Sequence, residues 1–122
     1  MPKTFDTPLG TISIAEEVIA TTAGQIALDC DGLISMASRR QVKDNLTELL
    51  GKENPGRGVE VRVTGDQTEV DLYIIVGYGT QIYEVAQNIR DQVRYVLSED
   101  IGINTEKVNI FVQGVRLATD HH

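Results

Sequence analysis

The sequence is poor in the side chains that nucleophilic and acid–base catalysis most often use. It has one cysteine, Cys30, and two histidines, His121 and His122, which are its last two residues. A nucleophilic site requires a nucleophile, a base within hydrogen-bonding distance and usually a group that orients the base. Asp29 and Asp31 flank Cys30, and their negative charge is expected to raise the pKa of the thiol. We therefore predict no catalytic residue, and expect Cys30 to be a small, partly buried residue near a helix end.

Carboxylates are present in pairs, but they are not grouped as metal or cofactor sites are. The pairs are Glu16 with Glu17, Asp29 with Asp31, Glu69 with Asp71, and Glu99 with Asp100. Two carboxylates on one strand face, such as Glu69 and Asp71, are too few for a calcium or magnesium site, and no EF-hand spacing occurs. Residues 77–80, Gly-Tyr-Gly-Thr, connect a predicted strand to a predicted helix but lack both the dinucleotide-binding and the P-loop fingerprints. We therefore predict no metal and no cofactor.

Long apolar runs and disulfide partners are also missing. With a single cysteine the chain cannot form an intramolecular disulfide, which is typical of a reducing compartment. The first residues contain no apolar stretch of the kind found in signal peptides, and no run of about 18 apolar residues occurs anywhere. We expect a cytoplasmic protein that does not insert into a membrane directly and that could be membrane-associated only through a partner.

Positive charge is scarce overall, with 11 basic against 18 acidic residues and a net charge of −7. This balance disfavours nucleic acid as a partner, because such binding depends on neutralising phosphates. Six of the basic residues nevertheless fall within residues 39–62, together with four acidic ones. A nucleic-acid or anionic-ligand binding module that uses this basic patch is therefore the alternative hypothesis. The candidate interaction residues are Arg39, Arg40, Lys43 and Arg57, together with Tyr78, which stands between two glycines as either a core residue or an exposed contact.

The hydrophobic periodicity predicts an α+β fold with the order β-α-β-α-β-β-α-β. Strands are expected at 11–14, 33–37, 59–63, 70–76 and 108–117, and helices at 15–27, 42–50 and 82–97. The two long helices and the short one should form one layer against a mixed sheet of four to five strands, with 59–63 and 70–76 as a hairpin. Glu69, Asp71 and Tyr73 alternate with the aliphatic residues of their strand, which indicates a solvated face. We predict a flexible segment at 1–9, one domain at 10–117 and a tail at 118–122.

Polar residues and glycines near the predicted helix ends indicate how the helices start and stop. Ser13 and Glu16 have the spacing of a capping box, and Thr80 is a candidate N-cap for the last helix. Gly102 is expected to end that helix.

Five blocks of the sequence, in order, resemble the alkaline-shock-protein family of Gram-positive bacteria, and in particular its short YloU-type members. They are residues 10–19, 31–36, 58–61, 70–79 and 108–115, with further similarity at 36–38 and 41–44. The resemblance implies a cytoplasmic protein of cell-envelope stress response and homeostasis without established enzymatic activity. It also implies self-association and two kinds of protein partner: a membrane-anchored family member, or a neighbouring kinase-like protein of fatty-acid metabolism. No ligand-binding residue follows from it.

These observations favour a non-enzymatic protein-interaction module that forms homo-oligomers. Apart from the resemblance, the hypothesis depends on the absence of catalytic groups and on the strand edges that an open sheet exposes, since such edges can pair with another chain.

Overall fold

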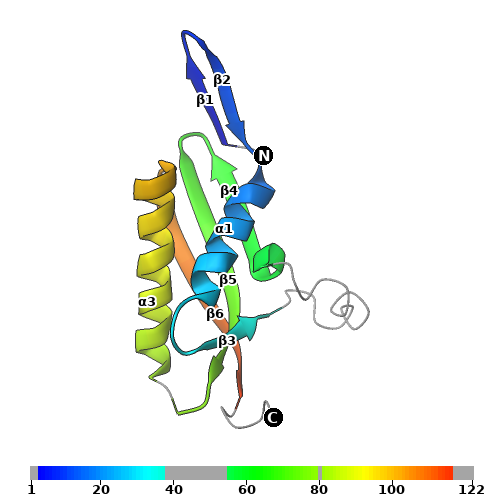
Figure 1. The fold of residues 1–122 in the computed structure, drawn as a ribbon, viewed down its shortest axis with the longest axis vertical. Helices are drawn as coiled ribbons and strands as arrows, with labels where there is room; N and C mark the ends of the chain where they lie inside the picture. The colour runs from blue at the N-terminus through cyan, green and yellow to red at the C-terminus, as the bar shows by residue number, and fades with distance from the viewer. Residues whose placement is uncertain (1–2, 38–54, 80, 117–122) are drawn as a thin grey trace.

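The structure is a computed structural model and describes residues 3–37, 55–79 and 81–116. Its elements, in chain order, are β1 (Lys3–Thr7), β2 (Gly10–Ile14), α1 (Glu16–Leu28), β3 (Leu33–Met36), the 3₁₀ turn η2 (Pro55–Gly58), β4 (Val59–Thr64), β5 (Gln67–Gly77), α3 (Ile82–Tyr95), the π-helical turn η3 (Val96–Ile101) and β6 (Thr105–Arg116). The fold is α+β, with α1 and α3 on one face of a mixed sheet (Figure 1). This layered arrangement agrees with the prediction. The predicted helix at 42–50 lies outside the described residues.

Strand β5 is the centre of the four-stranded sheet, because β3, β4 and β6 all pair with it. β6 runs parallel to β5 from the Thr68–Thr105 pair to the Gly77–Arg116 pair and so occupies one edge of β5. β4 and β3 are antiparallel to β5; β4 pairs with residues 67–72 and β3 with residues 74–76. Since a strand has only two edges, β3 and β4 share the other edge of β5, one after the other.

The core lies between the helices and one face of this sheet. The side chains of Val70, Leu72, Ile74 and Val76 alternate along β5, and all four are fully buried. Helices α1 and α3 complete the cluster with small and branched residues, which are Ile19, Ala23, Ala27, Ile89 and Val93. Burial of a single such aliphatic side chain contributes about 1.5–3 kcal/mol. The alternation seen in the sequence therefore places the hydrophobic side of the hairpin against the helices.

The first two strands form a sheet of their own, which differs from the prediction. The sequence predicts a flexible segment over residues 1–9, whereas Lys3–Thr7 form β1 and pair antiparallel with β2. The predicted strand at 11–14 exists, but it belongs to this two-stranded sheet and not to the main one. Figure 1 shows the hairpin extending beyond the end of the main sheet. The hairpin forms because a turn at Pro8-Leu9 joins two short segments that can pair. The prediction of a flexible segment took no account of this turn.

The helix starts differ from those predicted, whereas the last helix ends as expected. The N-cap of α1 is Ala15 and that of α3 is Gln81, and neither makes a side-chain capping hydrogen bond. The predicted Ser13–Glu16 capping box is therefore wrong, because Ser13 is already part of β2. At the other end α3 continues into η3, and Gly102 stops it with a left-handed φ of 88°, a conformation that glycine adopts without strain. None of the helices among the described residues is long and apolar enough to cross a bilayer.

Candidate interaction surface

The face of the sheet away from the helices carries a polar network that joins three strands. Arg62 of β4 donates two hydrogen bonds to Asp71 of β5, from Nη1 to Oδ2 at 2.7 Å and from Nη2 to Oδ1 at 3.1 Å. Asn109 of β6 donates from Nδ2 to Asp71 Oδ1 at 2.8 Å and to Glu69 Oε2 at 2.9 Å. Arg62 Nη2 also lies 3.1 Å from Glu69 Oε2. The predicted alternation along β5 is thus confirmed, and the charged residues of this face are linked across all three strands. The face is solvated only in part, however, because Asp71 is buried.

The network stabilises the charged forms of its members. The hydrogen bonds from Arg62 lower the pKa of the Asp71 carboxyl, and Asn109 adds to the effect. The pKa of Glu69 is lowered first by the hydrogen bond from Asn109 and then by Arg62. In return, the hydrogen bond to Asp71 raises the pKa of Arg62, which therefore stays protonated. A bidentate guanidinium–carboxylate pair of this kind has a defined geometry as well as charge.

The network has the features of a structural contact between strands and not those of a catalytic or metal-binding site. Asp71 is buried, and both of its oxygens accept hydrogen bonds from within the protein. No cluster of three or more potential metal ligands occurs in residues 3–37, 55–79 and 81–116. Arg62 belongs to the predicted basic patch, but three carboxylates surround it, those of Glu60, Glu69 and Asp71. It therefore supports the alternative hypothesis of an anion-binding patch poorly.

Beside the network, the same face carries an aromatic pair. The rings of Tyr73 on β5 and Phe111 on β6 stack with centroids 4.9 Å apart and planes 20° apart. They occupy directly paired positions of the parallel strands. Phe111 remains 40% exposed, and Ile75 on β5 is partly buried. This face, which no described helix covers (Figure 1), is therefore polar at one end and apolar toward the other. We call Tyr73 and Phe111 the aromatic pair, and this side of the sheet the uncovered face.

Strand β6 borders this face and forms an edge of the sheet. It is 12 residues long, and among the described residues it pairs only with β5. Edge strands of this length leave a row of backbone donors and acceptors available, and proteins usually shorten, cover or interrupt them. In β6 the regular pairing is interrupted by a bulge between Val112, which pairs with Ile74, and Gly114, which pairs with Ile75.

The structure places two of the predicted interaction residues and does not bring them to one site. Arg57 lies in η2 beside α1, whereas Tyr78 lies in the turn between β5 and α3. Tyr78 is 67% exposed, which decides between the two interpretations of this residue in favour of an exposed side chain. Arg39, Arg40 and Lys43 lie outside the described residues.

Cys30 matches its prediction. It follows α1 and is half-buried, and its thiol lies 3.4 Å from the Ile26 carbonyl oxygen. Burial raises the pKa of the thiol, and the charges of Asp29 and Asp31 raise it further. A thiol with a raised pKa is a poor nucleophile at neutral pH.

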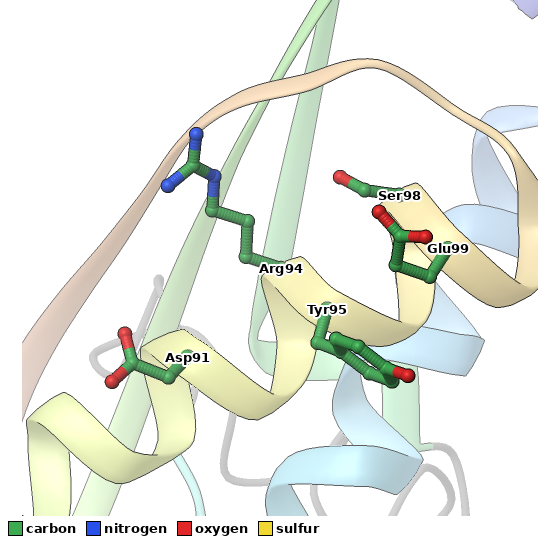
Figure 2. Close-up of a pocket in the computed structure, with 5 residues that line it drawn as sticks. All are labelled: Asp91, Arg94, Tyr95, Ser98 and Glu99. Carbon is green, nitrogen blue, oxygen red and sulfur yellow. The ribbon is translucent and has the colours of Figure 1, made fainter.

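A shallow pocket of about 310 Å³ lies on the exposed side of the last helix (Figure 2). It is lined by residues spaced as one helical stripe, which are Asp91, Arg94, Tyr95, Ser98 and Glu99. Arg94 extends away from the helix toward β6, where its Nε donates to the Thr105 carbonyl oxygen at 3.4 Å, while Tyr95 projects to the other side in this view. The stripe mixes both charges and converges on no single point. It is therefore a polar, solvent-exposed face of the helix and no candidate binding site.

Sequence reasoning missed the Arg62–Asp71–Asn109 network. The hairpin alone would have paired Arg62 with Glu69, because the strand lengths and the Gly65–Asp66 turn give the antiparallel register. The contribution of Asn109 depends on the register of a parallel strand that follows a whole helix, for which the sequence carries no local signal.

Comparison with known proteins gives a consistent result. Residues 4–117 match the model of the alkaline shock protein 23 family, here called the alkaline-shock-protein family, which is described as having a cell envelope-related function. The chain is 53% identical over 111 residues to the uncharacterized protein YloU of Bacillus subtilis, covering 91% of this chain and 92% of that protein. It is 36% identical to the uncharacterized protein Spy1614 of Streptococcus pyogenes, covering 96% and 97%. Among solved structures it is similar to the MamM CTD, with a TM-score of 0.51 at 13% identity, covering 82% of this chain and 99% of that one. This last likeness concerns the fold alone.

Proposed function

The chain belongs to the alkaline-shock-protein family, whose function is related to the cell envelope, and on that premise we propose that it is a non-enzymatic protein-interaction module. In this proposal it binds further copies of itself and other proteins, and it serves as a scaffold in the envelope stress response and homeostasis of Gram-positive bacteria. It reaches the envelope through a partner, either a membrane-anchored relative or a neighbouring kinase-like protein of fatty-acid metabolism.

The observation that supports the proposal is the outer edge of β6. In this 12-residue strand every second residue directs its backbone groups away from β5, where no described strand pairs with them. An added strand from another chain would satisfy these groups by β-augmentation, in which main-chain hydrogen bonds provide affinity and neighbouring side chains provide specificity. The polar network supports this use of the edge, because Asn109 connects β6 to Asp71 and Glu69 on β5. It thereby keeps the strand in register, while no described strand pairs with its outer side.

Two proline variants of β6 test the proposal with an internal control. Successive residues of a strand direct their backbone groups to opposite edges, so one of Ile110→Pro and Phe111→Pro removes a donor that faces β5 and the other removes one that faces outward. The inward variant should lose much of its thermal stability. The outward variant should remain folded but lose self-association, as measured by size-exclusion chromatography with light scattering.

Affinity purification followed by mass spectrometry, with the membrane fraction retained, identifies the other partners. A strictly monomeric wild type that also captures no specific partner would overturn the proposal. So would an outward proline variant that is folded and associates as well as the wild type.

A further inference from the structure

The β1–β2 hairpin has an apolar face that continues past the body of the protein. Phe5 pairs with Ile12 and Lys3 with Ile14, so these four side chains share one face of the hairpin. Near the domain, Phe5 and Ile14 pack against the core. Toward the tip, Ile12 is 58% exposed and Leu9 in the turn is 99% exposed. The core therefore extends along the hairpin to side chains that nothing described in this chain covers.

Such a hairpin is anchored at one end and unsupported at the other. Lys3 Nζ donates to the Gly65 carbonyl oxygen at 3.4 Å and lies 5.6 Å from the centroid of the Phe5 ring, which fixes the base. A two-stranded hairpin on its own is marginally stable in water, and it normally requires packing against a further element. The tip would therefore gain stability from a surface that receives it.

The surface cannot be the uncovered sheet face of the same molecule. A single residue, Ala15, separates β2 from α1. Helix α1 lies on the covered side of the sheet, and the hairpin extends outward from its N-terminal end (Figure 1). With its base fixed to the core and so short a connection, the tip can reach the opposite face only on another molecule.

Charge favours a second copy over an anionic membrane surface. Apart from the buried Lys3, the charged residues of the hairpin and the first turn of α1 are Asp6, Glu16 and Glu17. These carboxylates, in a protein of net charge −7, oppose adsorption to anionic lipids, which depends on basic residues. On β6, by contrast, Lys107 and Arg116 stand on either side of Phe111 and outnumber the one acid, Glu106. The β6 side of this sheet face thus offers an apolar centre between two basic residues. On its β5 side the carboxylates of Glu69 and Asp71 are already paired with Arg62.

We propose that the β1–β2 hairpin is a docking arm, which places Leu9 and Ile12 against the aromatic pair, Tyr73 and Phe111, of a second copy of this chain. The inference rests on the proposed function and names the element that the partner copy contributes. An arm that binds a different surface on its neighbour makes a heterologous contact, which produces either a closed ring or an open chain of subunits.

Cysteine trapping between two differently tagged chains tests the contact. Both chains carry Cys30→Ala; one also carries Ile12→Cys and the other Phe111→Cys. On mild oxidation of the mixture we expect a disulfide between the two chains, identified by mass spectrometry. The matched control is Ser13→Cys, which lies on the opposite face of the hairpin and should give little mixed disulfide with Phe111→Cys.

The doubly substituted variant Leu9→Ser/Ile12→Ser provides a second measurement. Both side chains are exposed, so its melting temperature should stay close to that of the wild type. Its self-association should weaken by about tenfold or more, because two apolar side chains no longer become buried.

The outcomes separate this inference from the proposed function. A wild type that neither self-associates nor captures a specific partner overturns both. A wild type that captures a partner but never self-associates overturns the docking arm alone. Suppose that the wild type self-associates. The docking arm alone is then overturned if the double variant self-associates equally well, or if no disulfide forms between Ile12→Cys and Phe111→Cys. A disulfide between two Phe111→Cys chains in place of the mixed one would show two β6 strands facing each other, and would also overturn it. Binding of wild type, but not of the double variant, to vesicles of anionic or neutral phospholipid would assign the tip to a membrane instead.

Discussion

The two faces of strand β5 differ in what they contribute to the protein. On the covered face Val70, Leu72 and Ile74 have no exposed surface and belong to the apolar core. On the open face Asp71 and Tyr73 meet partners from the adjacent strands across the sheet. Burial of aliphatic side chains is strong but non-directional, whereas a bidentate ion pair requires one alignment of its strands. The comparison indicates that the covered face provides most of the stability, while the open face fixes the register of the strands.

Truncation on the covered face should have the largest effect. Leu72→Ala leaves a cavity in a fully buried site, and we expect a loss of about 2–5 kcal/mol in the free energy of unfolding. Denaturant titration followed by circular dichroism measures it. The exposed Gln113→Ala on β6 is the control and should change stability little. If both variants lost similar amounts, the division between the faces would be wrong.

Neutralising the buried acid of the open face should have the next largest effect. Asp71→Asn retains the shape of the side chain but turns an acceptor of the Arg62 hydrogen bonds into a donor. Because Asp71 is buried, we expect a loss of about 1–3 kcal/mol in the free energy of unfolding. Glu69→Gln alters a more exposed member of the same network and should cost less. If Asp71→Asn were as stable as the wild type, the polar network would not be what fixes the register of the strands.

The pH dependence sharpens the same comparison. The native pKa of Asp71 is lowered, mainly by Arg62, so its stabilising contribution is complete above the unfolded-state pKa of about 3.9. The contribution is lost as the pH falls through the native pKa. The stability difference between wild type and Asp71→Asn should therefore be constant near neutrality and shrink below about pH 4. If this difference did not change in acid, Asp71 would not be charged in the native protein. Leu72→Ala serves as the control, because leucine has no titratable group.

Removal of the exposed aromatic should have the smallest effect on folding. Phe111 is 40% exposed, and we expect Phe111→Ala to lower the free energy of unfolding by only about 0.5–1.5 kcal/mol, most of it from the lost stacking on Tyr73. Self-association should weaken much more than stability does. If Phe111→Ala instead lowered stability strongly and left self-association unchanged, Phe111 would act as a core residue, like those of the covered face.

The sequence was sufficient for those parts of the fold that depend on local periodicity. Alternation in the hairpin and the apolar stripe of α3 led to elements at the observed positions, and Gly102 ended the helix as expected. Strand β1 was missed because five residues carry little periodic signal, and their pairing depends on a turn at Pro8-Leu9. The order of strands in the sheet was also out of reach, since it depends on how β3 and β4 share one edge of β5.

The candidate surface was predicted less well than the fold. The polar face of β5 was expected from Glu69 and Asp71, but Arg62 was assigned to a basic patch. In the structure its charge is directed to carboxylates across the sheet. Sequence proximity groups charges along the chain, whereas pairing in a sheet groups them across it, and only the second arrangement decides which charges remain available to a ligand.

The sharing of one edge of β5 by β3 and β4 has a consequence for local opening. Each outer strand of the main sheet can detach without breaking the others, because their hydrogen bonds all go to β5. Amide protons of the short strand β3 should therefore exchange with solvent through small local fluctuations, and those of the β1–β2 hairpin should do the same. Amide protons along β5 should exchange only when the whole domain unfolds. Amide protons of this protein should thus exchange at several distinct rates, with the slowest exchange confined to the one strand that the other three strands of the main sheet require.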